Sequence, residues 1–162
     1  MTTIELCEPI TDLAMRRIVD ELLAAGDEIT LRIDSPGGPT STSLALRVVL
    51  RTSLVPVRTV CVGEAVGGAA LLLASGAVGK RLLERHARIS LGRPAAPGSK
   101  TISTDDVVLD DPMFFHELAS ATGADRAALE RLGDGRWLSA HEAIELGFAD
   151  GIDDDGEEGS GR

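Results

Sequence analysis

Two glycine-bearing turns carry the chemistry that this sequence suggests. The first is Ser35-Pro36-Gly37-Gly38, which follows a β-rich run, and the second is GEAVGGAA at residues 63–70. Backbone N–H groups beside a Gly-Gly pair can face a carbonyl oxygen without a Cβ in the way, so such a turn can form an oxyanion hole. A tight structural turn is the alternative for a Gly-Gly pair considered alone.

Strand and helix patterns place both turns at one edge of a sheet. Alternating apolar residues predict a strand from Ile29 that ends at Ser35, because the following proline cannot donate to a ladder. The nearly continuous apolar run over residues 57–62 is typical of a strand covered on both faces. Residues 63–68 are then predicted to turn the chain, and residues 69–75 to form a helix buried in the centre.

The elements before and between these turns are predicted from periodicity and capping residues. A short first strand is expected over residues 3–7. Asp12 is the expected N-cap of a helix that ends near Gly26. A second helix is expected over residues 40–54, with early hydroxyls able to cap it. The apolar residues placed near one face of the first helix are Leu13, Ile18, Leu22 and Leu23.

The second half of the chain is predicted to add strands and helices to the same layers. A strand at residues 88–92 would place Ser90 and Gly92 on one face. Residues 94–110 read as a loop. The other expected elements are a helix from Asp111-Pro112 to Gly123, a helix over residues 125–132, a helix capped by Ser139 with Glu142 three residues on, and a last strand over residues 148–152.

Alternating strands and helices favour one α/β domain with a mainly parallel sheet and right-handed crossovers. The domain is expected to cover residues 1–152, followed by an acidic, disordered tail at residues 153–162. The formal net charge of −10 argues against nucleic acid or an anionic membrane as a partner. The longest apolar run, residues 65–74, is far shorter than the roughly 20 residues of a membrane span.

Composition also bears on compartment and cofactors. The N-terminal residues lack the pattern of a secretion signal. Cys7 and Cys61 are expected to be buried free thiols in a reducing cytoplasm. The histidines and cysteines have no ligand-like spacing, so no metal site and no cofactor are expected. His116 and His141 are expected to face solvent from amphipathic helices.

Five collinear segments carry a resemblance to a known family. They are IDSPGG (33–38), VCVGEAVGGAALLLASGAVGKR (60–81), RISLGRP (88–94), Thr122-Gly123 and RWLSAHEAIELGFAD (136–150). With these motifs the sequence resembles the proteolytic subunit of the Clp protease, ClpP, over nearly the whole chain. The resemblance implies the ClpP/crotonase fold and a ring-forming serine peptidase subunit in which SPGG lines the substrate site.

The family's Ser-His-Asp triad is not preserved here. Gly67 occupies the place of the serine in the family's G-Q-A-A-S-M-G-A segment, and Gly92 that of the histidine in R-x-x-I-H-Q-P. At the aspartate position the chain has Leu132, and only a gap would bring Asp134 there. Because the triad needs a nucleophile, a base and a group that orients the base, triad peptidase activity is expected to be absent.

The family's oxyanion donors survive in this sequence, since they are main-chain groups. The resemblance assigns these donors to the N–H groups of Gly38 and Gly68, in a pocket that includes Gly37. Glu64 and Ser90 are the alternative reactive groups, because crotonase relatives of this fold often use a glutamate beside the oxyanion hole. A surface role for Glu64 and a small strand residue at Ser90 are the plainer interpretations.

Two departures from the family concern assembly. Residues 94–122 correspond to the handle that joins two rings and are shorter by several residues, so ring stacking is left open. The extension that forms the family's axial loops is not expected here, so an AAA+ unfoldase would be engaged only indirectly.

The preferred hypothesis is an inactive ClpP-like subunit that forms a homo-oligomer or a mixed ring with active Clp subunits and binds peptide or acyl ligands. The alternatives are an enzyme of altered chemistry that uses the retained oxyanion hole, and a self-assembling ring whose serine peptidase designation is only inherited from the fold.

Overall fold

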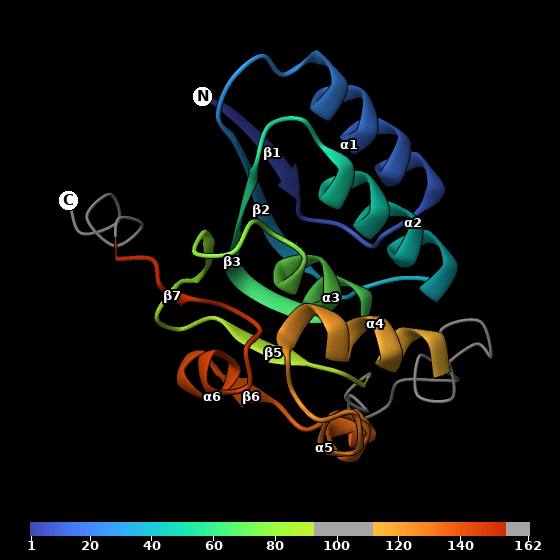
Figure 1. Cartoon of the computed structure of the whole chain (residues 1–162), viewed down its shortest axis with the longest axis vertical. Coiled ribbons are helices and arrows are strands. Elements are labelled where there is room, and N and C mark those ends of the chain that lie inside the picture. The colour runs from blue at the N-terminus through green and yellow to red at the C-terminus, as the bar shows by residue number, and fades with distance from the viewer. Residues whose placement is uncertain (93–111, 155–162) are drawn as a thin grey trace.

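The computed structural model describes residues 1–92 and 112–154, which form an α/β domain (Figure 1). Its sheet has the order β1-β2-β3-β4-β7, with β5 paired to β3 and β6 paired to β5. Every pairing is parallel except that of β5 with β6, which confirms the predicted mainly parallel sheet. The strands are β1 Thr2–Leu6, β2 Ile29–Ser35, β3 Val57–Val66, β4 Arg81–Leu83, β5 Arg88–Ser90, β6 Leu138–Ser139 and β7 Gly151–Ile152.

Helices α1 to α4 gather on one side of the central strands, whereas α6 lies beside β5 and β6 (Figure 1). In Figure 1, α1 and α2 lie beside each other next to β1–β3, and α3 and α4 follow below them. Every residue of α3 is buried, which confirms the predicted central helix. The helices are α1 Asp12–Ala24, α2 Thr40–Thr52, α3 Gly68–Ala74, α4 Pro112–Thr122, α5 Arg126–Arg131 and α6 Ala140–Glu145, and a 3-10 turn spans Leu132–Asp134.

The two faces of the first strands differ in character. Ile4, Leu31 and Ile33 are fully buried on the face that the helices cover. On the other face, Glu5 and Arg32 are exposed and form an ion pair at 3.2 Å. This alternation follows from the two-residue repeat of a strand, and it gives the sheet one apolar and one polar side.

The predicted caps of α1 are wrong by one residue, and two of its four predicted apolar-face residues are buried. Its N-cap is Thr11, whose Oγ1 accepts from the Ala14 N–H at 3.1 Å, and Asp12 is the first helical residue. Its C-cap is Ala25 and not Gly26.

The buried residues of α1 are Ala14, Ile18 and Leu22, spaced by four residues, whereas Leu13 and Leu23 are 77% and 80% exposed. Leu13 comes one residue before the buried stripe and Leu23 one residue after it, so both side chains point to solvent.

Two boundaries around the glycine turns also differ from expectation. Helix α2 ends at Thr52, and its N-cap Pro39 makes no side-chain hydrogen bond, so the early hydroxyls do not cap it. Strand β3 continues to Val66, so the predicted turn over residues 63–68 is reduced to Gly67. The strand is longer because β5 pairs with residues 64–66 and supplies ladder hydrogen bonds that the sequence does not reveal.

In the second half, the expected strand at residues 88–92 is β5, which ends before Gly92, and β4 was not predicted. Asp125 is the N-cap of α5, and the capping box of Ser139 and Glu142 is confirmed. The last strand covers only Gly151–Ile152. The expected loop at residues 94–110 and the Asp111 cap lie outside the described residues.

The last two described residues are held by ion pairs. Asp153 pairs with Arg58 at 3.3 Å and Asp154 with Arg85 at 2.8 Å. Within the described residues, no helix is long and apolar enough to cross a membrane. Cys61 is buried as expected, but Cys7 is exposed, because it follows the end of β1 instead of lying within it.

Candidate functional site

The two glycine turns lie directly against one another. Gly37 has a φ of +89°, in the left-handed region that glycine enters without strain. A Cβ built on it would clash with the carbonyl oxygen of Val66 and stand 3.5 Å from the nitrogen of Gly68. The end of β2 can therefore approach the start of α3 this closely only because Gly37 has no side chain.

Gly38 and Gly68 carry the two expected amide donors. Gly68 is the first residue of α3, so its N–H has no acceptor inside the helix. Among residues 1–92 and 112–154, neither of these two N–H groups has a hydrogen-bond acceptor. The N–H of Gly67 differs, because it donates to the carbonyl of Ser90 at 2.8 Å. The edge therefore holds two main-chain N–H groups without an acceptor among the described residues, of which that of Gly68 belongs to a buried residue and that of Gly38 to a half-buried one.

Hydrogen bonds to the residues before α1 hold the first glycine turn in place. The hydroxyl of Ser35 donates to the Glu8 carbonyl at 2.7 Å and accepts from the Gly37 N–H at 3.1 Å. The Ile10 N–H donates to the Gly37 carbonyl at 2.9 Å. These three hydrogen bonds leave Gly37 little freedom to rotate, so the amide that follows it has a defined direction.

Ile10 and Ser43 pack behind the donor glycines. The Cβ of Ile10 would stand 3.0 Å from a Cβ on Gly38, and its Cδ1 3.5 Å from a Cβ on Gly68. A Cβ on Gly68 would also clash with the hydroxyl of Ser43, which donates to the Pro39 carbonyl at 3.0 Å. Sequence reasoning missed both residues, since nothing distinguishes an isoleucine before a helix or a serine inside one.

The position expected to hold the catalytic base has no room for a side chain. A Cβ on Gly92 would stand 2.7 Å from the carbonyl oxygen of Gly133 and 2.8 Å from the nitrogen of Gly135. Real Cβ atoms essentially never come this close to the main chain, so even alanine would force the 3-10 turn at residues 132–134 to move. The space for a histidine is filled by backbone.

The two candidates for the triad aspartate position are engaged in other contacts. Leu132 is partly buried and packs against the core. Asp134 is exposed, and its Oδ1 accepts from the N–H of Arg136 at 3.0 Å. The carboxylate of Asp134 thus closes its own turn.

The alternative reactive groups are both engaged in other contacts. Ser90 is fully buried, and its hydroxyl donates to the carbonyl of Gly92 at 2.9 Å. Glu64 approaches Arg88 at 3.5 Å, and the guanidinium of Arg88 lies 3.8 Å from the ring centre of Trp137. His86, His116 and His141 are exposed, as expected for the last two.

Cysteine does not provide a nucleophile at this edge either. Cys61 lies in β3 and is fully buried. Burial raises its pKa to about 12, against a hydrogen bond from the Gly63 backbone that lowers it, so the thiolate is not populated near neutrality. Within the described residues, no group of three or more His, Cys, Asp or Glu side chains could hold a metal ion.

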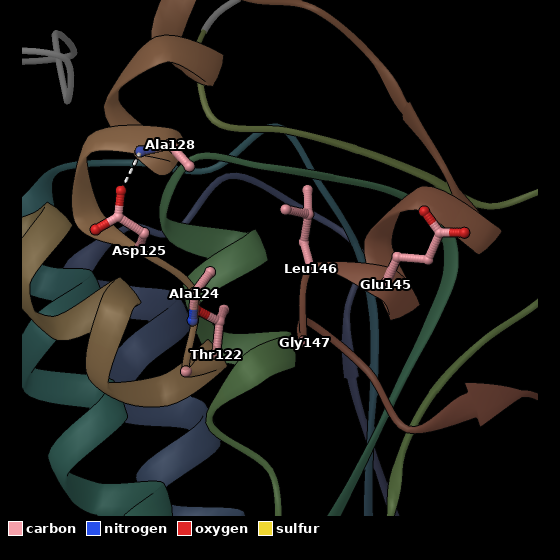
Figure 2. Close-up of a pocket in the computed structure, with 8 residues that line it drawn as sticks. Thr122, Ala124, Asp125, Ala128, Glu145, Leu146 and Gly147 are labelled. Carbon is pink, nitrogen blue, oxygen red and sulfur yellow. Dashed lines mark hydrogen bonds between the residues drawn. The ribbon is translucent and has the colours of Figure 1, made fainter.

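A separate hollow of about 320 Å³ lies where α4 and α6 end (Figure 2). Figure 2 shows Asp125 and Glu145 on opposite sides of it with Leu146 between them. Gly147 closes its base, where a Cβ would clash with the carbonyl of Thr122. Asp125 is engaged as the cap of α5, with its Oδ2 3.4 Å from the Ala128 nitrogen. This hollow contains none of the predicted site residues.

A buried arginine lies behind this hollow and was also missed from the sequence. Arg81 donates to the carbonyls of Ala74, Ala121 and Gly147 at 3.0–3.3 Å. It also forms a two-pronged pair with Asp150, at 3.0 Å from Nε and 2.7 Å from Nη2. The hydrogen bonds of Arg81 lower the pKa of the Asp150 carboxyl, against a smaller opposing effect of burial. Arg81 therefore joins the ends of α3, α4 and α6 to the sheet.

Comparisons with known proteins agree with the fold and with the motifs. A family model described as Clp protease matches residues 1–155. The chain is 34% identical over 158 residues to "ATP-dependent Clp protease proteolytic subunit 2" of Thermobifida fusca (strain YX), covering 91% of the chain and 78% of that protein. It is 35% identical over 142 residues to the subunit of the same name from Mycolicibacterium paratuberculosis (strain ATCC BAA-968 / K-10). This match covers 81% of the chain and 70% of that protein.

A solved structure shares the same architecture. It is the ClpP protease catalytic domain from Plasmodium falciparum, which superposes with a TM-score of 0.80 over 94% of this chain and 85% of that one. The sequences are 24% identical, so this likeness bears on the fold alone. The predicted ClpP/crotonase-type fold is thus confirmed by a three-dimensional match.

Proposed function

The chain belongs to the Clp protease family, and from this premise we propose that it is a ClpP-like subunit without triad peptidase activity that keeps its oxyanion hole as a binding site. The observation that carries the proposal is the closed base position. Gly92 lacks a side chain, and the backbone of Gly133 and Gly135 fills the space that one would need.

The chemistry of acyl transfer supports the absence of peptidase activity. A serine peptidase needs a hydroxyl to attack, a base within hydrogen-bond reach, and a group that orients the base. Gly67 and Gly92 offer no side chain at the first two positions, and Asp134 is engaged in its own turn. The remaining groups cannot compensate for these losses, because the nucleophile needs the base and the base needs the group that orients it.

Binding does not need these lost groups. The N–H groups of Gly38 and Gly68 belong to the main chain and are without acceptors among the described residues. Such donors bind a peptide carbonyl or a carboxylate oxygen directly. We therefore assign the pocket to an uncleaved peptide or acyl ligand. The rival enzyme of altered chemistry has less support, because Glu64 and Ser90 are both engaged elsewhere.

Assembly forms part of the same proposal. The matched relatives are named as proteolytic subunits of an ATP-dependent Clp protease. By analogy, this chain enters a homo-oligomer or a mixed ring with active Clp subunits, and it reaches an AAA+ unfoldase only through those subunits. A cytoplasmic location is part of this hypothesis, and the two free cysteines are compatible with it.

Three measurements test the proposal. Purified protein is treated with a fluorophosphonate probe and with a peptide and acyl-thioester panel, and neither labelling nor turnover is expected. The amide resonances of Gly38 and Gly68 are followed by NMR during titration with an N-acetylated tripeptide carboxylate, and both are expected to shift. Light scattering of the chain alone and mixed with active Clp subunits of the same cell gives the assembly.

Each measurement has an outcome that contradicts one part of the proposal. Labelling of Ser90, or turnover that Glu64→Gln abolishes, would establish the enzyme of altered chemistry. Unchanged Gly38 and Gly68 resonances at saturating tripeptide would remove the binding site. A chain that stays monomeric in both light-scattering samples would rule out the subunit role.

A further inference from the structure

A bulge separates the two halves of β3 just before the site. Residues of β2 and β3 pair in step up to Ile33 and Cys61, and pairing resumes at Ser35 and Ala65. Asp34 alone therefore lies opposite three residues of β3, numbers 62–64. Such a bulge leaves ladder groups without their usual partners and bends the strand.

The side chain of Asp34 replaces the missing acceptor. Its Oδ1 accepts from the N–H of Glu64 at 3.1 Å. The carboxylate also lies over Gly63, because a Cβ there would stand 2.6 Å from Oδ1 and 2.7 Å from Cγ. The hydrogen bond and the glycine requirement both place the Asp34 carboxylate across the bulge.

The bulge directs the second donor turn. Before it, residues 59–61 of β3 pair with β4, and after it residues 64–66 pair with β5. Gly67 and Gly68 follow at once, while Gly37 lies three residues after Asp34 on the other strand. The carboxylate thus links the two strands immediately before the two turns that carry the donors.

We propose that Asp34 is a positioning residue for the ligand site. By holding the Glu64 amide across the bulge, it sets the separation and direction of the Gly38 and Gly68 N–H groups. This inference rests on the proposed function, in which those two groups bind a carbonyl or carboxylate oxygen. Asp34 acts through the main chain and does not itself contact the ligand.

The test uses the full chain and four variants: Asp34→Ala, Asp34→Asn, Gly63→Ala and the double variant with alanine at both positions. Residual dipolar couplings of the Gly38 and Gly68 N–H bonds report the directions of these bonds without ligand, and NMR titration gives the dissociation constant of the N-acetylated tripeptide.

Asp34→Ala and Gly63→Ala are expected to change the couplings and to weaken binding about three- to tenfold. Asp34→Asn keeps an acceptor oxygen and is expected to retain both properties. The double variant is expected to bind no more weakly than the weaker single variant.

Asp125→Ala is the matched control, since it also removes a carboxylate that caps a main-chain N–H, but at the start of α5. It is expected to lower the melting temperature without changing the glycine couplings. Wild-type couplings and affinity in Asp34→Ala would overturn the inference and leave Asp34 a purely structural role. If the wild-type chain binds no tripeptide, the proposed function fails, and the couplings of the unliganded variants still decide the role of Asp34.

Discussion

The backbone of Gly135 closes over Gly92: a Cβ built on Gly92 would stand 2.8 Å from the Gly135 nitrogen. The two glycines come from distant parts of the chain, one after β5 and the other after the 3-10 turn. The position that the family resemblance assigns to a general base therefore holds no side chain and is enclosed by main chain.

Restoring the missing side chains should not restore activity. In a Gly67→Ser/Gly92→His double variant, the imidazole has no space beside the 3-10 turn, so it cannot activate the new hydroxyl. Fluorophosphonate labelling followed by mass spectrometry checks this, with an active ClpP subunit treated in parallel. Rapid labelling of the introduced serine would show that the 3-10 turn moves aside easily.

A smaller substitution isolates the steric contact. Gly92→Ala is expected to lower the free energy of unfolding by about 1–3 kcal/mol, because its Cβ meets backbone that must shift. Gly26→Ala is the matched control, since nothing lies within 4 Å of its Cβ and its φ is not in the left-handed region. The control is expected to be neutral or to stabilise by about 0.4–1 kcal/mol. Urea unfolding compares the two, and equal stability would contradict the steric argument.

Arg81→Met should destabilise the fold much more than replacement of an exposed arginine. It removes the guanidinium from the Asp150 carboxylate, which keeps the N–H groups of Gly79 and residue 81 as donors, and from three helix-end carbonyls. Loss of one partner of a buried ion pair costs about 3–5 kcal/mol, and the partial exposure of Asp150 places this variant at the lower end of that range or below it. Arg126→Met is the control, because its pair with Glu130 is half exposed and should contribute less than about 0.5 kcal/mol. Urea unfolding measures both, and similar losses in the two variants would refute this ranking.

Asp150 should make the protein sensitive to acid. Its pKa in the folded chain is lowered chiefly by the hydrogen bond to Arg81, so the unfolded chain binds the proton more readily. The resulting stabilisation is complete above the unfolded pKa of about 3.9 and is lost as the pH falls through the lower, folded value. Unfolding free energies between about pH 6 and pH 2 should fall less steeply in Asp150→Asn than in wild type. Asp20→Asn serves as the control for an exposed carboxylate, and parallel curves for Asp150→Asn and wild type would disprove the assignment.

The two cysteines should differ in reactivity. Iodoacetamide at pH 8 is expected to modify the exposed Cys7 slowly, since desolvation and then the hydrogen bond to Glu5 raise its pKa. Cys61, with a pKa of about 12 and no exposed surface, should remain unmodified until urea unfolds the chain. Peptide mapping distinguishes the sites, and folded Cys7→Ser protein that still takes up one label would show Cys61 to be accessible.

Sequence patterns foresaw the features that depend on neighbouring residues. The end of β2 at SPGG, the buried α3 and the capping box at Ser139 each follow from local apolar content, proline or capping geometry. Two of the four apolar residues expected near one face of α1, Ile18 and Leu22, are buried, whereas Leu13 and Leu23 are exposed. Apolar residues stand on both sides of the buried stripe, so the sequence pattern fits more than one helical face.

The features that sequence patterns missed depend on distant partners. The bulge opposite Asp34 coincides with the point where β3 changes its partner from β4 to β5, which the alternation of a single strand cannot reveal. The closure of Gly92 depends on where Gly133 and Gly135 dock, many residues later in the chain. Both decide what the candidate site can do, and neither changes the apolar pattern from which strands are predicted.

The contacts of Arg81 also bear on the order in which the chain folds. Its partners stretch from Ala74 to Asp150, so its full set of hydrogen bonds forms only after α4 and α6 have docked. Contacts that close such long loops form late, after the transition state has assembled more local structure. We therefore expect loss of Arg81 to accelerate unfolding more than it slows folding, so that each molecule of the variant stays folded for a shorter time.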